Sequence, residues 1–268
     1  MDHALSTLEP YLERVGLRGT PTLAQLHRAH VVAIPFENLD PHRGVPVSLE
    51  LDALERKLIA QRRGGYCFEN NLLLAAALRA LGAQVEPMLA RVRVGRPPGV
   101  PRPRTHLVLR VRDGGEVWLA DVGFGSGTLL EPIPFGPGDV HEQSGWRVRL
   151  IQEGAELVLQ TETESGWSDL YGFVPEPVPA VDIETSNWFT STHPRSPFVT
   201  GLIVTQHAAD GSMMSLSDWS GLALTEQTPT RTVVTHPALQ DVPGLLADRF
   251  ALPGFTLDGA GRIALIAR

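Results

Sequence analysis

The chain has 268 residues, which predicts one or two domains, and its 43% apolar and 20% charged residues predict a buried core rather than disorder. A net charge of −7 argues against a general nucleic-acid binder, because such a protein needs a basic face. The longest wholly apolar run, residues 72–78, is far shorter than the roughly 20 residues that span a bilayer. With one cysteine and no signal-peptide pattern, we expect a cytoplasmic protein with no intrachain disulfide and no membrane partner.

Apolar residues at helical spacing dominate the N-terminal third of the chain. A first helix is expected over residues 5–15. Thr20 and Pro21 predict the N-cap and the first position of a second helix, and Ser48 predicts the cap of a third. The fourth, from Cys67 to about Leu81, has almost no polar face at its centre. We therefore expect it to lie centrally in a helical bundle.

From residue 84 onward the pattern changes to short runs of valine and leucine separated by turns, which predicts a β-sheet or barrel. Strands are expected at residues 88–94, 106–112, 116–122, 147–151 and 156–161, with later ones at 202–206 and 231–235. The remaining expected segments are a proline-rich loop at 95–103, a linker at 175–179 and a late helix at 243–250. The sequence thus predicts an α+β protein in three parts: helices in 1–86, the sheet in 87–185 and mixed structure in 186–268.

The single cysteine lies between a Gly-Gly turn and the fourth predicted helix, in the run R-G-G-Y-C-F-E-N-N of residues 63–71. A cysteine at a helix N-terminus faces N–H groups that lack acceptors and the positive end of the helix dipole, and both favour the reactive thiolate. A lone cysteine is more often a small buried hydrophobe, but a Gly-Gly turn permits the close backbone approach typical of a site. We therefore interpret Cys67 as a candidate nucleophile.

A nucleophilic cysteine needs a base, and the base needs an orienting carboxylate. Among nine histidines, His106 is the best placed, because it begins a strongly apolar strand. Asp121 ends the next strand, and the turn at residues 113–115 joins the two strands in a hairpin. Both side chains lie near the open end of that hairpin, so they can be neighbours of each other and of Cys67. Papain-like proteases and transglutaminases use the same chain order, so these three residues alone do not define the reaction.

Several short motifs occur together in this chain. I-P-F-E-N-L begins at Ile34, R-G-G-Y-C-F-E-N at Arg63, T-H at Thr105 and D-V-G-F-G at Asp121. Together they resemble the arylamine N-acetyltransferase family. Residues 187–202, with S-T-H-P and S-P-F, resemble the entry to that family's third region. The resemblance covers roughly the first 205 residues, and it is less clear in the tail.

The resemblance implies a fold and a reaction. The fold is a helical bundle, a central β-barrel and a C-terminal α/β lid around a cysteine-protease-like Cys-His-Asp core. Cys67 is then the nucleophile, His106 the base and Asp121 the residue that orients the base. The implied reaction is ping-pong: the thiolate takes an acetyl group from the cosubstrate acetyl-CoA, and an arylamine or hydrazine attacks the thioester. No bound cofactor and no metal are expected.

Other residues are candidates for contacts with the substrates. The four that could line a pocket for an aromatic ring are Phe36, Phe68, Phe124 and Phe198, of which the first is more typical of ordinary core. Residues 123–127 are glycine-rich but lack the pattern of a dinucleotide fingerprint. The resemblance implies that Gly123, Gly125 and Ser126 pass near CoA.

Two further sets of polar residues have structural explanations. Arg63, Glu37 and Glu69 are interpreted as an ion network that fixes the cysteine's loop rather than as catalysts. His27 and His30 lie three residues apart on one face of the second predicted helix. One interpretation of that spacing is a pair of metal ligands, but the favoured interpretation is a solvated helix face.

Alternatives to the acetyltransferase remain open. A cysteine hydrolase of the papain or transglutaminase type would use the same three residues. A macrolactam-forming amide synthase, which takes its acyl group from a polyketide carrier, would share the fold as well. The physiological amine, the preferred acyl donor and the oligomeric state are not determined by the sequence.

Overall fold

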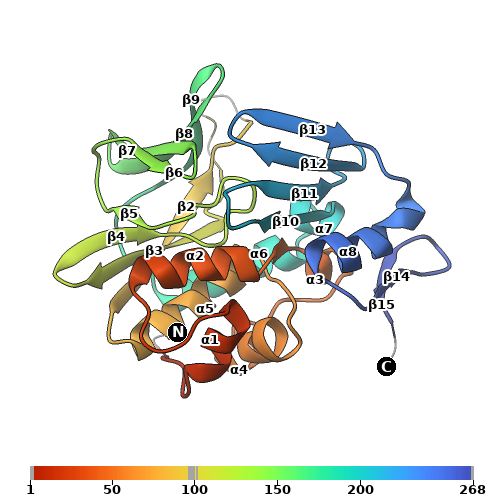
Figure 1. The fold of residues 1–268 in the computed structure, drawn as a ribbon, viewed down its shortest axis with the longest axis horizontal. Coiled ribbons are helices and arrows are strands. Elements are labelled where there is room, and N and C mark those ends of the chain that lie inside the picture. The colour runs from red at the N-terminus through yellow and green to blue at the C-terminus, as the bar shows by residue number, and fades with distance from the viewer. Residues whose placement is uncertain (1–2, 96–99, 101, 267–268) are drawn as a thin grey trace.

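Helices fill the N-terminal part of the chain in the computed structural model, which describes residues 3–95, 100 and 102–266 (Figure 1). They are α1 (Glu9–Val15), α2 (Leu23–Ala33), α3 (Leu39–His42), α4 (Leu51–Leu54), the π-helix η1 (Glu55–Ala60) and α5 (Cys67–Ala80). The predicted central position of the fourth long helix is confirmed, because residues 67–78 of α5 are all buried. Its apolar side chains join those of α1 and α2 in one core.

Two predicted helix caps are wrong. The N-cap of α2 is Thr22 rather than Thr20: the Thr22 hydroxyl accepts from the Gln25 amide, and the Gln25 side chain accepts from the Thr22 amide. This reciprocal pair satisfies two N–H groups, which leaves Pro21 outside the helix. Ser48 does not cap α4 either. Its hydroxyl accepts from the backbone of Glu50, so it forms a local turn before the helix begins.

The middle of the chain is one antiparallel sheet with the order β5-β4-β3-β2-β9-β8-β7-β6. Its strands are β2 (Gln84–Val92), β3 (His106–Asp113), β4 (Glu116–Ala120), β5 (Ile133–Pro134), β6 (His141–Gln143), β7 (Trp146–Glu153), β8 (Glu156–Thr163) and β9 (Gly166–Phe173). The sheet curls into a nearly closed barrel, because side chains from β2, β3, β4, β7, β8 and β9 pack in a single interior core. Strand β9 was not predicted, because its glycines and polar residues interrupt the apolar alternation.

The C-terminal part adds a second sheet with the order β1-β10-β11-β12-β13. Its strands are β1 (Phe36–Glu37), β10 (Ile203–His207), β11 (Met213–Ser217), β12 (Ala223–Thr228) and β13 (Arg231–Thr235). The other elements of this part are α6 (Ala180–Thr192), α7 (Pro197–Thr200), η2 (Leu239–Asp241), α8 (Val242–Phe250) and a separate two-stranded sheet of β14 (Phe255–Leu257) and β15 (Ile263–Leu265). Strand β1 comes from the helical part of the chain, so the N-terminal helices are joined to the C-terminal sheet by strand pairing (Figure 1).

Two remaining expectations concern segments without regular structure and the membrane. Most of the proline-rich loop predicted at 95–103 lies outside the described residues. Within the described ranges, no helix has the length and apolar character needed to cross a bilayer.

Candidate active site

The cysteine occupies the first position of α5, where the helix dipole and the free first-turn N–H groups favour an anion. Its side chain is 3% exposed. The sulfur lies 3.6 Å from the carbonyl oxygen of Thr105, the residue that precedes His106. The predicted helix start at Cys67 is therefore confirmed, and it brings the thiol to the beginning of β3.

The two glycines before the cysteine are explained by close packing. The Gly65 amide donates to the carbonyl oxygen of Pro35 at 3.2 Å. A Cβ on Gly64 would lie 2.3 Å from that oxygen, and one on Gly65 would lie 2.8 Å from the Cβ of Glu69. Neither position has room for a side chain, so the turn can approach α5 and the end of α2 only with glycine at both places.

His106 and Asp121 are neighbours, as the predicted hairpin requires. Leu109 pairs with Ala120, so continuing the register sets Asp121 opposite Val108. Side chains two residues apart along a strand share a face, which makes Asp121 a diagonal neighbour of His106. The His106 Nε2–H donates to Asp121 Oδ2 at 2.7 Å, with both residues almost completely buried.

His106 and Asp121 each stabilise the charged form of the other. Burial alone would lower the pKa of His106, but the charge and hydrogen bond of Asp121, together with a hydrogen bond to Cys67, raise it to about 10. Burial alone would raise the pKa of Asp121, but His106 and the other donors hold it below its usual value. The arrangement therefore favours the protonated form of His106. Its Nε2 is bonded to Asp121, so Nδ1 is the ring nitrogen left for an interaction with Cys67.

The segment after β4 is held by side chains rather than by strand pairing. Asn71 on α5 donates to Asp121 Oδ1 at 2.9 Å and to the Leu107 carbonyl oxygen at 2.7 Å, and its own oxygen accepts from the Val122 amide. Asp121 Oδ1 also accepts from the Gly123 amide. Asn71 was not predicted, although an asparagine one turn after the cysteine, directly before an apolar run, was a usable signal.

The predicted ion network is present and larger than expected. Arg63 donates to Glu37 at 2.6 Å and to Asp40 at 2.8 Å. Lys57 joins the set and lies 2.9 Å from Asp40 and 2.7 Å from Glu69. Burial raises the pKa of Glu69 to about 7 in spite of the Lys57 ammonium beside it. Because Glu69 also accepts from the backbone N–H before the cysteine, the network anchors the start of α5.

The predicted solvated face at His27 and His30 is wrong, because both side chains are fully buried. His30 bonds to the Tyr11 hydroxyl at 2.8 Å and to the Asn70 side-chain oxygen at 3.4 Å, and Asn70 in turn donates to the Gly65 carbonyl. No cluster of three or more potential metal-ligating side chains occurs in the described parts of the chain. The pair lies in the core because α2 packs against α5 and the end of β4, which periodicity alone did not reveal.

The four predicted pocket phenylalanines differ in exposure. Phe68 is fully buried and Phe36 nearly so, whereas Phe124 and Phe198 are partly exposed. The Phe124 ring lies 4.9 Å, centroid to centroid, from the His106 ring, and the Phe198 ring lies 6.1 Å from the Phe36 ring. Phe124 is therefore the candidate nearest the imidazole.

A second aromatic ring beside the imidazole belongs to Tyr171 of β9, a strand that the sequence did not predict. Tyr171 lies 4.8 Å from His106 and 5.0 Å from Phe124, again between ring centroids. Tyr171 was not predicted as a site residue, because its strand was not predicted. The rings of Phe124 and Tyr171 together form an aromatic wall beside the imidazole.

The three residues predicted to lie near CoA belong to the loop that follows Asp121. Gly123 is buried against α5, and the Gly125 carbonyl accepts from His207 Nε2 at 2.8 Å, which ties the loop to β10. Ser126 is exposed. This loop thus runs from the His106–Asp121 pair to the surface.

Replacing Gly123 with alanine is expected to destabilise the protein. The new Cβ would lie 2.7 Å from the Cys67 Cα and 2.9 Å from the Asn71 side-chain nitrogen. Because the nearest atom is backbone, the added methyl forces the two segments apart, at a cost of about 2 kcal/mol, or a Tm about 4–8 °C lower. Thermal unfolding measures the effect. Gly138→Ala is the control, since no atom lies within 4 Å of its added Cβ. Equal Tm values for the two variants would contradict the packing argument.

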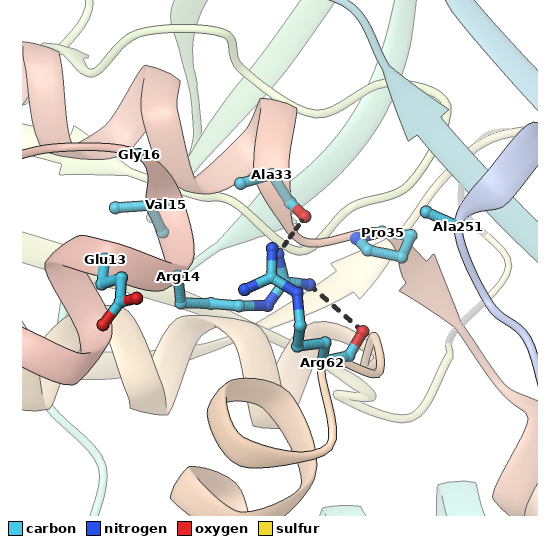
Figure 2. Close-up of a pocket in the computed structure, with 8 residues that line it drawn as sticks. All are labelled: Glu13, Arg14, Val15, Gly16, Ala33, Pro35, Arg62 and Ala251. Carbon is cyan, nitrogen blue, oxygen red and sulfur yellow. Dashed lines mark hydrogen bonds between the residues drawn. The ribbon is translucent and has the colours of Figure 1, made fainter.

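A separate cavity of about 310 Å³ lies behind the turn that precedes the cysteine. Figure 2 shows the Arg14 guanidinium beside it, donating to the Ala33 carbonyl oxygen at 2.7 Å and to the Arg62 carbonyl oxygen at 3.4 Å. These carbonyls lie at the ends of α2 and η1, where a cation is favoured by the helix dipole. Burial and the nearby charge of Arg62 lower the pKa of Arg14 to about 10. Arg14 therefore acts as a shared cap for two helices.

Similarity to known proteins agrees with this geometry. A family model described as N-acetyltransferase matches residues 20–253. An arylamine N-acetyltransferase from Mycolicibacterium smegmatis is 44% identical over 203 residues, covering 72% of this chain and 74% of the relative. One from Escherichia coli (strain K12) is 35% identical over 262 residues, covering 94% and 92%. The solved structure of Mycobacterium marinum arylamine N-acetyltransferase in complex with CoA has a TM-score of 0.87 at 38% identity, covering 92% of this chain and 93% of that chain.

A helical bundle beside a nearly closed barrel, with these matches over most of the chain, defines an acyltransferase enzyme. The chain belongs to the arylamine N-acetyltransferase family. The α+β fold and the family resemblance expected from the sequence are thereby confirmed.

Proposed function

We propose that this enzyme transfers an acetyl group from acetyl-CoA to arylamines and hydrazines through a thioester on Cys67. The observation that carries the proposal is the His106–Asp121 hydrogen bond at 2.7 Å next to Cys67, whose sulfur lies 3.6 Å from the carbonyl oxygen of the residue before His106. The relative from Mycobacterium marinum has been solved with CoA, which supports a CoA donor for this chain.

In the first half-reaction the Cys67 thiolate attacks the carbonyl carbon of acetyl-CoA. The carbon–sulfur bond to CoA breaks, and the departing CoA sulfur takes a proton from the His106 imidazolium. Because the pKa of His106 is raised, the ring holds that proton ready at neutral pH. The backbone N–H groups in the first turn of α5 are candidates to stabilise the tetrahedral oxyanion, since they have no acceptor within the helix.

In the second half-reaction the amine attacks the acetyl carbon, and the neutral His106 accepts the proton that the amine loses. The Cys67 sulfur leaves as the thiolate, which restores the starting state. An arylamine is weakly basic and mostly neutral at pH 7, whereas an alkylamine is protonated and cannot attack. Ring contacts with Phe124 and Phe198 would add about 1 kcal/mol each. Aryl and hydrazine acceptors should therefore react faster than simple alkylamines.

A matrix of acetyl-CoA and arylamine concentrations tests the order of the steps. Parallel double-reciprocal lines are expected, because CoA leaves before the amine attacks. Mass spectrometry of enzyme mixed with acetyl-CoA alone should find one acetyl group on Cys67. Intersecting lines together with an unmodified cysteine would mean a ternary complex and would contradict the proposal.

The same experiment separates the alternatives. A cysteine hydrolase would release the acyl group to water at a rate that added amine does not change. A macrolactam-forming amide synthase would leave acetyl-CoA untouched and accept an acyl group only from a carrier. Substituting propionyl-CoA or malonyl-CoA in the matrix would identify a different preferred donor within the same mechanism.

A further inference from the structure

We propose that His27 is a positioning residue, which holds Asp121 in register with His106 by accepting the backbone N–H of Asp121. This role rests on the proposed function of the Cys67, His106 and Asp121 site. It assigns a task to a buried imidazole that the acetyl-transfer chemistry does not use.

The contact lies where the strand ladder ends. Strand β4 stops at Ala120, and the amides of residues 121, 122 and 123 are each satisfied by a side chain. The Asn71 side-chain oxygen accepts from the Val122 amide, and the Asp121 carboxylate accepts from the Gly123 amide. His27 Nε2 accepts from the Asp121 amide at 3.1 Å. Because no strand pairing fixes this residue, its backbone position depends on these acceptors.

The imidazole is held on both sides in one tautomer. His27 Nδ1 lies 3.2 Å from the Leu130 carbonyl oxygen, which can only accept, so Nδ1 carries the proton and Nε2 offers a lone pair. The ring therefore spans from the segment after β4 to the segment before β5. It ties both to α2, the helix that packs beside α5.

The surroundings keep the ring neutral. Burial lowers the pKa of His27 to about 4, although the charge of Asp121 opposes the shift. The other titratable group near the ring is His30, one turn along α2, and burial lowers its pKa to about 3. Arg28 and Glu131 beside them are partly exposed and form an ion pair with each other at 2.9 Å. A charged His27 would place a second donor against the Asp121 amide, so only the neutral ring can hold this position.

Loss of the acceptor should weaken the His106–Asp121 pair. If Asp121 drifts from register, the imidazolium loses stabilisation, and the pair with the Cys67 thiolate becomes less favourable than the neutral thiol and imidazole. The pH dependence of Cys67 alkylation then changes, whereas a purely structural loss would lower only the melting temperature.

The test compares the rates of alkylation by iodoacetamide at pH 9.5 and pH 7. The proposed function requires a Cys67–His106 ion pair at both pH values, so the wild-type ratio is expected to stay within about twofold. For His27→Leu, which fills the space without an acceptor, we expect a ratio of about tenfold. His27→Gln, whose side-chain oxygen can replace Nε2, should restore a ratio close to wild type. Leu246→Ala in α8 controls for lost stability, since that buried residue belongs to the separate C-terminal core.

Each outcome has a distinct meaning. A flat wild-type profile with an equally flat His27→Leu profile overturns the role of His27 and leaves the proposed function standing. A wild-type profile like that of a free thiol overturns the ion pair itself and the positioning role with it. Equal ratios for the leucine and glutamine variants show that space filling, not the hydrogen bond, matters, and so also reject the proposal.

A measurement on the unmodified protein covers the case in which His27→Leu does not fold. Long-range ¹H–¹⁵N spectra of the histidine rings report the tautomer, with the His27 signals assigned from their absence in His27→Gln. We expect His27 as the neutral Nδ1–H tautomer between pH 5 and 7. An Nε2–H tautomer, or titration near the ordinary value of about 6.5, would overturn the proposal.

Discussion

Replacing Cys67 with alanine is expected to lower kcat for acyl transfer by roughly 10⁴-fold or more and to leave the fold intact. Cys67 is the only cysteine in the chain, so no second thiol can carry the thioester. The substitution removes one buried sulfur atom at the first position of α5, at a cost of about 1 kcal/mol, so the protein should still fold. CoA release and acetylated amine are both measured, with thermal unfolding as the check on folding.

Chemical modification provides a second view of the same residue. Iodoacetamide should inactivate the wild-type enzyme, and acetyl-CoA should protect it, because both compete for one sulfur. Cys67→Ser is the matched control: it keeps a polar atom in place, but a hydroxyl is a much weaker nucleophile at neutral pH. Undiminished turnover in a folded Cys67→Ala enzyme would reject covalent catalysis.

Asp121→Asn is expected to lower kcat by about 10³–10⁴-fold, far more than the small change in shape suggests. Asp121 Oδ1 accepts from Asn71 and from the Gly123 amide, so the oxygen of the new amide should take that place. Its NH₂ group then faces His106 Nε2 and turns that nitrogen into an acceptor. The ring proton moves to the nitrogen that faces Cys67, so the neutral imidazole can no longer take a proton there.

The loss of the carboxylate charge lowers activity further, in addition to the effect of the wrong His106 tautomer. Without the carboxylate, burial dominates at His106 and its pKa falls from about 10 toward or below the ordinary value, so the imidazolium is lost at neutral pH. Single-turnover acetylation of Cys67 measures the effect directly. Glu162→Gln removes a charge from a partly exposed residue of β8 and should retain wild-type rates. Wild-type kinetics in a folded Asp121→Asn enzyme would remove Asp121 from the proposed mechanism.

Local patterns were sufficient for much of the site. The start of α5 at Cys67 followed from the Gly-Gly turn and the apolar run behind it. The proximity of His106 and Asp121 followed from a hairpin with a short turn, because strand register sets which residues face each other. The start of α5 and the register of this hairpin depend on neighbours in the chain, so local patterns were enough to predict them, whereas the caps of α2 and α4 were predicted wrongly.

Long-range packing decided the rest. Lys57 and Asp40 complete an ion network with Arg63, and Tyr171 reaches the imidazole from a strand that the sequence did not predict. The burial of His27 was predicted wrongly, since helical periodicity cannot say which partners cover a face. Which polar side chains become buried, and thus neutral or paired, depends on the dielectric and the donors that other segments bring.

The sequence by itself thus determined the family, the α+β class and the order of the three residues proposed for catalysis, because motifs and periodicities are local. Only the tertiary structure decided how those residues are held. The carboxylate of Asp121 needs Asn71, and its amide needs His27, from helices 50 and 94 residues earlier in the chain. Such contacts form only when distant segments close around a shared core, where leaving a buried polar group unpaired costs about 1–3 kcal/mol.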